Sequence, residues 1–181
     1  MTRTDVPSGL PDPSLPAPSL RETAARLALL PLRIFLGVTF VYAGLDKLTD
    51  STFLSATGSG SLGELMHGVR DTAAVPALVD LALKSPVGFG IAIAIGELLV
   101  GLGALAGLLT RIAATGGALI SLSLWLTVSW AVSPYYYGND LVYLMAWTPL
   151  ILAGAPYLSV DSLIRRPAGP VDPERRSRRT A

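Results

Sequence analysis

Four long apolar runs dominate the middle of the chain. They extend over residues 27–45, 87–109, 112–132 and 141–158. A helix needs about 20 apolar residues to cross the hydrocarbon core of a bilayer, and each run approaches or exceeds that length. A soluble protein with four such runs would keep little polar surface for water. The pattern therefore predicts an all-α integral membrane protein, built as a four-helix bundle.

The segment between the first two runs, residues 46–86, has a different pattern. Ser61 and Glu64 have the spacing of a capping box at the start of a helix. Apolar residues follow at helical intervals, namely Leu62, Leu65, Met66 and Val69. Pro76 interrupts this pattern, and a second one continues to Pro86. We expect two short amphipathic helices here, lying on the outer membrane surface or capping the bundle.

Basic residues predict the orientation of the bundle in the cell membrane. One side carries both tails and the short connection after the second run, with Arg3, Arg21, Arg26, Arg111, Arg165, Arg166, Arg175, Arg176, Arg178 and Arg179. On the other side, acidic residues outnumber Lys47, Arg70 and Lys84. We therefore expect a disordered, Pro-rich cytoplasmic tail over residues 1–26, a membrane domain over residues 27–164 and a basic cytoplasmic tail over residues 165–181. A cleaved signal peptide is the alternative for the first run, but the run begins late and contains Arg33.

Composition narrows the chemistry that the chain can perform. It has no cysteine, which excludes disulfides, thiolate metal sites and iron–sulfur clusters held by this chain. Its single histidine, His67, cannot build a bis-histidine haem site alone, and we interpret it as an ordinary, partly exposed residue, with proton transfer as the alternative. Electron chemistry would need a bound quinone, an outside cofactor or a partner subunit, and no metal is expected. The net charge of +1 does not indicate nucleic acid, and the basic tail suits anionic lipid.

Two charges lie well inside the apolar runs, Arg33 in the first and Glu97 in the second. Even on lenient scales such a charge costs about 3 kcal/mol near the membrane centre, so both should turn inward, and we expect them to face each other. At 1.5 Å per residue, Arg33 lies about 9 Å and Glu97 about 18 Å from the cytoplasmic boundary, a gap that long side chains or water would have to close. The pair is either a register lock between two helices or part of a polar pocket that binds a headgroup or relays a proton.

Small residues and aromatic residues suggest how the helices pack and where a ligand would bind. Gly37, Phe40 and Gly44 share a helix face with Arg33, as Gly101 and Ala104 do with Glu97. Most of the aromatic residues near the outer end are typical of an interfacial belt: Trp130, Tyr135, Tyr136, Tyr137 and Tyr143.

Two tryptophans lie deeper than such a belt requires. We expect Trp125 and Trp147 to lie at similar depth and to line an apolar pocket with Glu97. Tyr143 is a further candidate for contact with a cofactor in that pocket.

Four blocks of sequence together resemble the DoxX/DoxD family. They are "LRIFLGVTFVYAGLDKL", "ATGSGSLGEL", "GELLVGLGALAGLLTRIAATGGALISLSLWLTVSW" and "SPYYYGNDLVYLMAWTPLILAGA". The last block looks most like the DoxD branch, and the resemblance covers about residues 27–164. It implies a four-helix membrane protein associated with thiosulfate:quinone oxidoreductase, which oxidises thiosulfate to tetrathionate and passes electrons to quinone. In the archaeal type of that enzyme DoxD works with a DoxA polypeptide, and nothing in this chain looks like an appended DoxA domain.

The leading hypothesis is a quinone-interacting membrane subunit of an oxidoreductase. Glu97 would accept or relay protons, and Arg33 would orient Glu97 or hold an anionic group. Trp125 and Trp147, with Tyr143, would contact the quinone ring. The alternatives are a non-catalytic membrane scaffold that docks a soluble redox partner, and a small-solute or proton-coupled transporter. Membrane lipid, a second oxidoreductase subunit or further copies of the chain are the expected partners.

Overall fold

A computed structural model describes residues 27–155 and 158–164, together with Arg21 and Ala24. The predicted tails, residues 1–26 and 165–181, otherwise lie outside the described residues. The helices are α2 (Leu30–Thr49), α3 (Leu62–Val69), α4 (Pro76–Leu83), α5 (Pro86–Ala106), α6 (Thr110–Thr127), the 3₁₀ helix η1 (Tyr135–Tyr137), α7 (Asn139–Ala153) and α8 (Val160–Ile164). No strand occurs in this described part, which confirms the all-α prediction.

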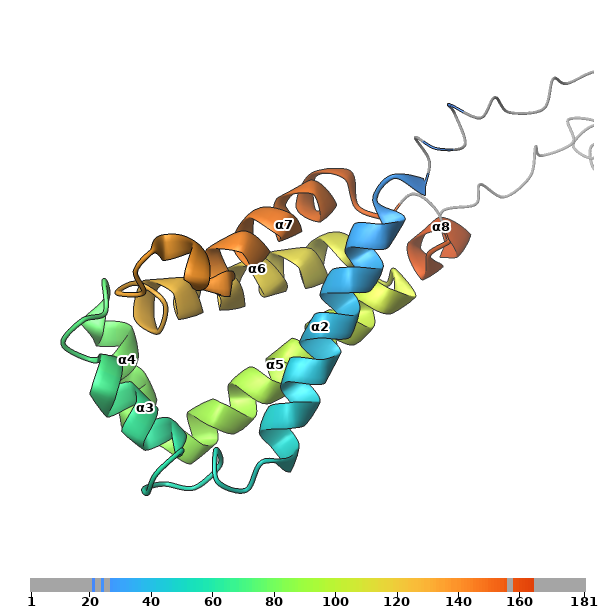
Figure 1. Cartoon of the computed structure of the whole chain (residues 1–181). Coiled ribbons are helices and arrows are strands. Elements are labelled where there is room, and N and C mark those ends of the chain that lie inside the picture. The colour runs from blue at the N-terminus through green and yellow to red at the C-terminus, as the bar shows by residue number, and fades with distance from the viewer. Residues whose placement is uncertain (1–20, 22–23, 25–26, 156–157, 165–181) are drawn as a thin grey trace, which may run out of the picture.

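The four long helices form two pairs. α2 packs along α5, and α6 packs along α7, whereas α5 and α6 contact each other less extensively. Figure 1 shows that the two pairs meet where α5 turns into α6 and diverge toward the other end, where α3 and α4 lie. α8 lies at the end where the pairs meet (Figure 1). The bundle is therefore a wedge, with the two short helices at its wide end.

Helix boundaries differ from the apolar runs at several ends. α2 continues past Leu45 to Thr49, so Asp46 and Lys47 belong to the helix. α5 ends where Gly107 adopts a left-handed conformation at φ 64°, and the amide of Leu108 then donates to the carbonyl of Gly103. Apolar character alone does not mark these ends, because caps and turns decide them.

Glycines allow α2 and α5 to approach closely. A Cβ atom on Gly44 would lie 2.7 Å from the carbonyl oxygen of Ala94, and one on Gly101 would lie 2.6 Å from the backbone nitrogen of Val41. Both contacts are with backbone atoms, so a larger residue would push the helices apart. The predicted small-residue face of the first two long helices is confirmed.

Trp147 fills the centre of the bundle. It is fully buried, and its ring contacts Phe40 edge to face at a centroid distance of 5.0 Å. Gly117 makes room for it, because a Cβ atom there would lie 2.3 Å from the indole. The surrounding core consists of Leu36, Val100, Ala104, Ala114, Ala118 and Leu150.

The two short helices predicted between the first two long ones are present as α3 and α4. Ser61 caps α3 by accepting from the amide of Glu64 at 3.1 Å, and the Glu64 carboxylate accepts from the amide of Gly60 at 2.7 Å, so the capping prediction is confirmed. Arg70 joins α3 to α4 through Asp80 with Nε–Oδ1 at 2.6 Å, and this hydrogen bond raises the pKa of Arg70. The amide of Ala74 donates to the carbonyl of Leu126 at 2.9 Å, which ties this layer to the end of α6.

The outside of the bundle is apolar. Large side chains are exposed on each long helix, including Phe35 on α2, Leu99 on α5, Leu119 on α6 and Leu152 on α7. By length and composition, α5 is the one described helix that could cross a membrane, and only 33% of its apolar window is buried inside the protein. α7 has 15 residues and α2 contains three charged residues, so length and composition do not confirm the predicted four membrane spans.

Candidate functional site

A buried ion pair joins α2 to α5. Lys47 Nζ lies 2.8 Å from Glu97 Oε2 and 3.0 Å from Oε1, so one ammonium binds both carboxylate oxygens. The Glu97 side chain is 4% exposed and the Lys47 side chain 24%. Lys47 also donates to the carbonyl oxygen of Ala43 at 3.4 Å. Charges removed from water to this degree require close pairing, which this geometry supplies.

The predicted pairing of Glu97 with Arg33 is wrong. Arg33 lies 14 positions before Lys47 on the same helix, which is about 21 Å at 1.5 Å per residue. The apolar run ends at Leu45, and a helix that ended there would place Lys47 at the membrane surface. Because α2 continues to Thr49, Lys47 reaches the level of Glu97 inside the bundle, and Arg33 stays at the other end.

Arg33 belongs to a cluster of polar contacts at the narrow end of the wedge, which also includes Leu158 and Asp161. Its Nη2 donates to the carbonyl oxygen of Leu158 at 2.6 Å, and the Asp161 carboxylate interacts with it electrostatically. Asp161 also accepts from the amides of Leu109 at 2.8 Å and Thr110 at 2.9 Å, the first amides of α6. A carboxylate is favoured there because these amides have no partner within their helix.

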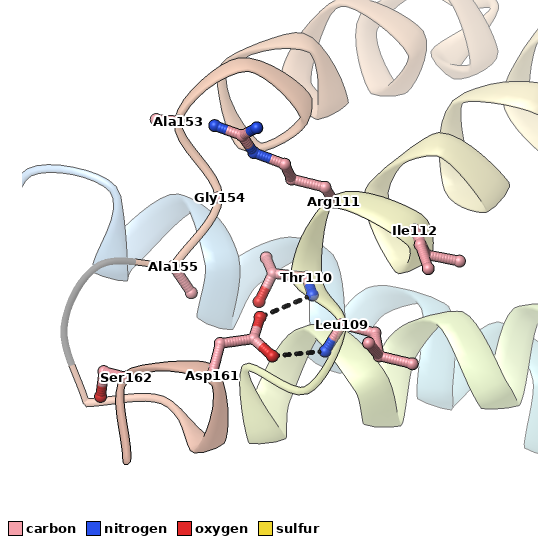
Figure 2. A pocket seen from close by; sticks show the side chains of 9 residues that line it. All are labelled: Leu109, Thr110, Arg111, Ile112, Ala153, Gly154, Ala155, Asp161 and Ser162. Atoms are coloured by element: carbon pink, nitrogen blue, oxygen red, sulfur yellow. Dashed lines mark hydrogen bonds between the residues drawn. The ribbon is translucent and has the colours of Figure 1, made fainter. Parts of the chain in front are cut away.

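Figure 2 shows the hydrogen bonds of Asp161 to Leu109 and Thr110, which belong to the lining of a surface pocket. The pocket has a volume of about 470 Å³. Asp161 points at the α5–α6 turn, while Arg111 extends toward the end of α7, where its Nη2 donates to the carbonyl oxygen of Leu152 at 2.8 Å. Asp161 and Arg111 are thus engaged with backbone groups of neighbouring segments. The arrangement holds α8 and the end of α7 against the α5–α6 turn.

A cavity of about 400 Å³ lies at the wide end of the wedge, between the helix pairs and the α3–α4 layer. Its size is within the range of small-molecule sites. Its lining is mostly apolar and comes from six helices and the α2–α3 connection: Lys47, Phe53, Leu62, Leu65, Met66, Leu78, Leu81, Ala82, Phe89, Ile93, Ser123, Leu124, Thr127, Val128 and Asp140. Because the helix pairs diverge at this end, they leave space that α3 and α4 cover.

Polar groups meet at one part of this cavity. Lys47 and Asp140 line it, and Ser129 Oγ donates a short hydrogen bond to Asp140 Oδ2. Asp140 also interacts electrostatically with Lys47 and with Glu97. The ammonium of Lys47 therefore lies near the carboxylates of Glu97 and Asp140, beside an apolar cavity. Such an arrangement can bind the polar end of a mostly apolar ligand and can transfer protons.

The predicted aromatic residues lie elsewhere. Trp147 faces Gly117 on α6, and Trp125 lies eight residues further along that helix, about 12 Å away. The ring of Trp125 contacts Trp130 instead, at a centroid distance of 5.3 Å. Tyr143 contacts Phe40, at 6.2 Å. The expectation that Trp125 and Trp147 lie at similar depth is therefore wrong. None of the three predicted aromatic residues lines the cavity, and Glu97 does not line it either.

Phe53 and Phe89 supply the aromatic surface of the cavity, and Lys47 and Asp140 supply its charge. Sequence reasoning missed all four as site residues. One signal was present for Lys47, because it follows Gly44 by three positions and so continues the face that begins at Arg33. Asp140 gave no such signal, since it is far from Lys47 in sequence and only the fold brings them together.

The fold and the cavity define a helical protein with an apolar exterior and a largely apolar internal cavity. The chain belongs to the DoxD family: the family model described as "TQO small subunit DoxD" matches residues 28–176. This family is membrane-associated, and the match confirms the resemblance drawn from the sequence. Comparisons with curated proteins and with solved structures gave no match.

The ion pair yields a prediction for stability. Lys47→Met leaves Glu97 buried without its cation, so we expect a loss of about 3–5 kcal/mol in the free energy of unfolding. Adding Glu97→Met should recover most of that loss, because two apolar side chains replace the pair. Equilibrium denaturation of the full chain in detergent measures both values. A double variant as unstable as the sum of the two single variants would contradict direct pairing.

Proposed function

We propose that this protein is the membrane subunit of a quinone-linked oxidoreductase and that it holds the quinone ring in the cavity beneath α3 and α4. Thiosulfate:quinone oxidoreduction is the proposed overall reaction, as the family description suggests. The observation that carries the proposal is the cavity itself, whose apolar walls end at Lys47 and Asp140. A quinone has the matching chemistry, a flat apolar ring with carbonyl oxygens at its edge.

The residues present fit such a substrate. Lys47 would exchange its long hydrogen bond to the Ala43 carbonyl oxygen for one to a ring oxygen. Phe53, Phe89 and Met66 would pack on the ring. Reduction to the quinol takes up two electrons and two protons, and oxidation of two thiosulfates to one tetrathionate supplies the two electrons. Glu97 would hold Lys47 in place and exchange a proton through it. The chain has no cysteine, so we propose that thiosulfate reacts on a partner subunit.

The other predicted site residues take different roles in this proposal. Arg33 would secure α8 at the narrow end, as its bond to Leu158 supports. Trp147 and Tyr143, through their contacts with Phe40, would fix the position of α2 and thus of Lys47. Trp125 would belong to the aromatic surface near Trp130.

We also propose that the four long helices α2, α5, α6 and α7 all lie in the cell membrane, with both termini in the cytoplasm. The exposed apolar side chains on each of them support this, because a water-facing surface of that extent is rare. The excess of arginine in the tails and at Arg111 supports the orientation.

Topology can be measured directly because the chain lacks cysteine. We expect Ser59→Cys, between α2 and α3, to react with a membrane-impermeant maleimide added to intact cells or spheroplasts. Ser8→Cys and Ser177→Cys should react only after the membrane is permeabilised. Labelling of either tail variant in intact spheroplasts would refute the proposed orientation.

Binding of a short-tailed quinone, decylubiquinone, to the purified full chain tests the proposed function. We expect saturable binding that Lys47→Met weakens about 10- to 100-fold, because a hydrogen bond from a charged group is lost. Leu78→Trp should weaken binding at least as much by filling the cavity. Val142→Trp, on the exposed face of α7, is the matched control and should bind like the parent chain. If the Leu78 and Val142 variants bound decylubiquinone equally well, the cavity would be excluded as the quinone-binding site.

A further inference from the structure

Asp140 connects the cavity with the wide end of the bundle. It lies in the first turn of α7, is only partly buried, and lines the cavity together with Lys47. Its Oδ2 accepts a hydrogen bond from the hydroxyl of Ser129, in the connection between α6 and α7. Trp130, the next residue, is exposed. Asp140 and Ser129 thus link the chamber to the protein surface.

The groups near the cavity differ in their exposure. Glu97 is 3% exposed and the Lys47 side chain is 24% exposed, and Asp140 and Ser129 are partly buried. Asp140 faces Lys47 on α2 and Glu97 on α5, with which it interacts electrostatically. The cavity residues contributed by α3, α4 and α6 are all uncharged. Asp140 therefore lies beside two neighbouring charges and the hydroxyl of Ser129.

A proton donor in the cavity wall is inferred from the proposed function, because two-electron reduction of a quinone requires two protons at the ring oxygens. Glu97 is not among the residues that line the cavity, since it lies behind Lys47, whereas Asp140 is in the wall. We propose that Asp140 is a catalytic proton donor to the bound quinone and that Ser129 relays its replacement proton from the wide end of the bundle. An O–H bond forms at a ring oxygen as the O–H bond of Asp140 breaks. Water then reprotonates Asp140 through the Ser129 hydroxyl.

A purely structural role for Asp140 makes a different prediction. An acidic residue in the first turn stabilises a helix through its dipole, and the bond to Ser129 braces the α6–α7 connection. Asp140→Asn keeps a side-chain oxygen that can accept from Ser129 but removes the titrating proton. Asp46→Asn is the matched control, because Asp46 is an exposed acid one position from Lys47 and does not line the cavity.

The test is electrochemically induced infrared difference spectroscopy on the purified full chain loaded with decylubiquinone, in which an electrode supplies the electrons. We expect reduction of the bound quinone to change a carboxylic-acid carbonyl band. Asp140→Asn should lose that component while still binding decylubiquinone, and Asp46→Asn should keep it. Ser129→Ala should shift the band in frequency and change the pH at which it appears.

The outcomes separate this inference from the proposed function. Failure of the parent chain to bind decylubiquinone overturns both. Binding by Asp140→Asn with an unchanged carboxylic-acid band overturns the role of Asp140 alone and leaves the quinone site standing. Loss of the band together with retained binding supports the proton donor, because a merely structural carboxylate would not follow the redox state of the ligand.

Discussion

The ion pair between Lys47 and Glu97 is the interaction on which the rest of the structure depends. Two charges taken this far out of water are tolerated only if each satisfies the other, and the ammonium binds both oxygens of the carboxylate. The pair joins α2 to α5 beside the cavity at the wide end of the wedge. Close approach at Gly44 brings the helices near enough for it to form. The Lys47–Glu97 ion pair thus joins two helices and also supplies Lys47 to the polar end of the cavity.

The wedge follows from how the remaining space is filled. At the narrow end, Asp161 satisfies the first amides of α6 and Arg33 holds the segment before α8, so the pairs are closed there. In the middle, Trp147 occupies the room left by Gly117. At the wide end the helix pairs leave a cavity, which α3 and α4 cover. The chamber between them therefore combines walls from helices that are distant in sequence.

Local patterns predicted much of this fold. Apolar runs indicated the long helices, the spacing of Ser61 and Glu64 indicated a helix start, and the glycines indicated a packing face. The site was harder, because it depends on where helices end and how deep each residue lies. Lys47 follows an apolar run, so the pattern predicts it at a surface, although its helix continues for a full turn past Leu45. Counting residues from the ends of the apolar runs predicts one depth for Trp125 and Trp147, but the helices end elsewhere. Asp140 comes close to Lys47 only through the tertiary fold, and local sequence patterns do not predict that proximity.

We propose that the cavity under α3 and α4 holds a quinone ring against Lys47. Photolabelling of the purified chain with an azidoquinone, followed by mass spectrometry of the labelled peptides, is a direct test. We expect labels at cavity residues such as Met66 and Phe89, all suppressed by excess decylubiquinone. Labels confined to the exposed apolar faces or to the surroundings of Trp147, or labels that excess decylubiquinone does not suppress, would contradict it.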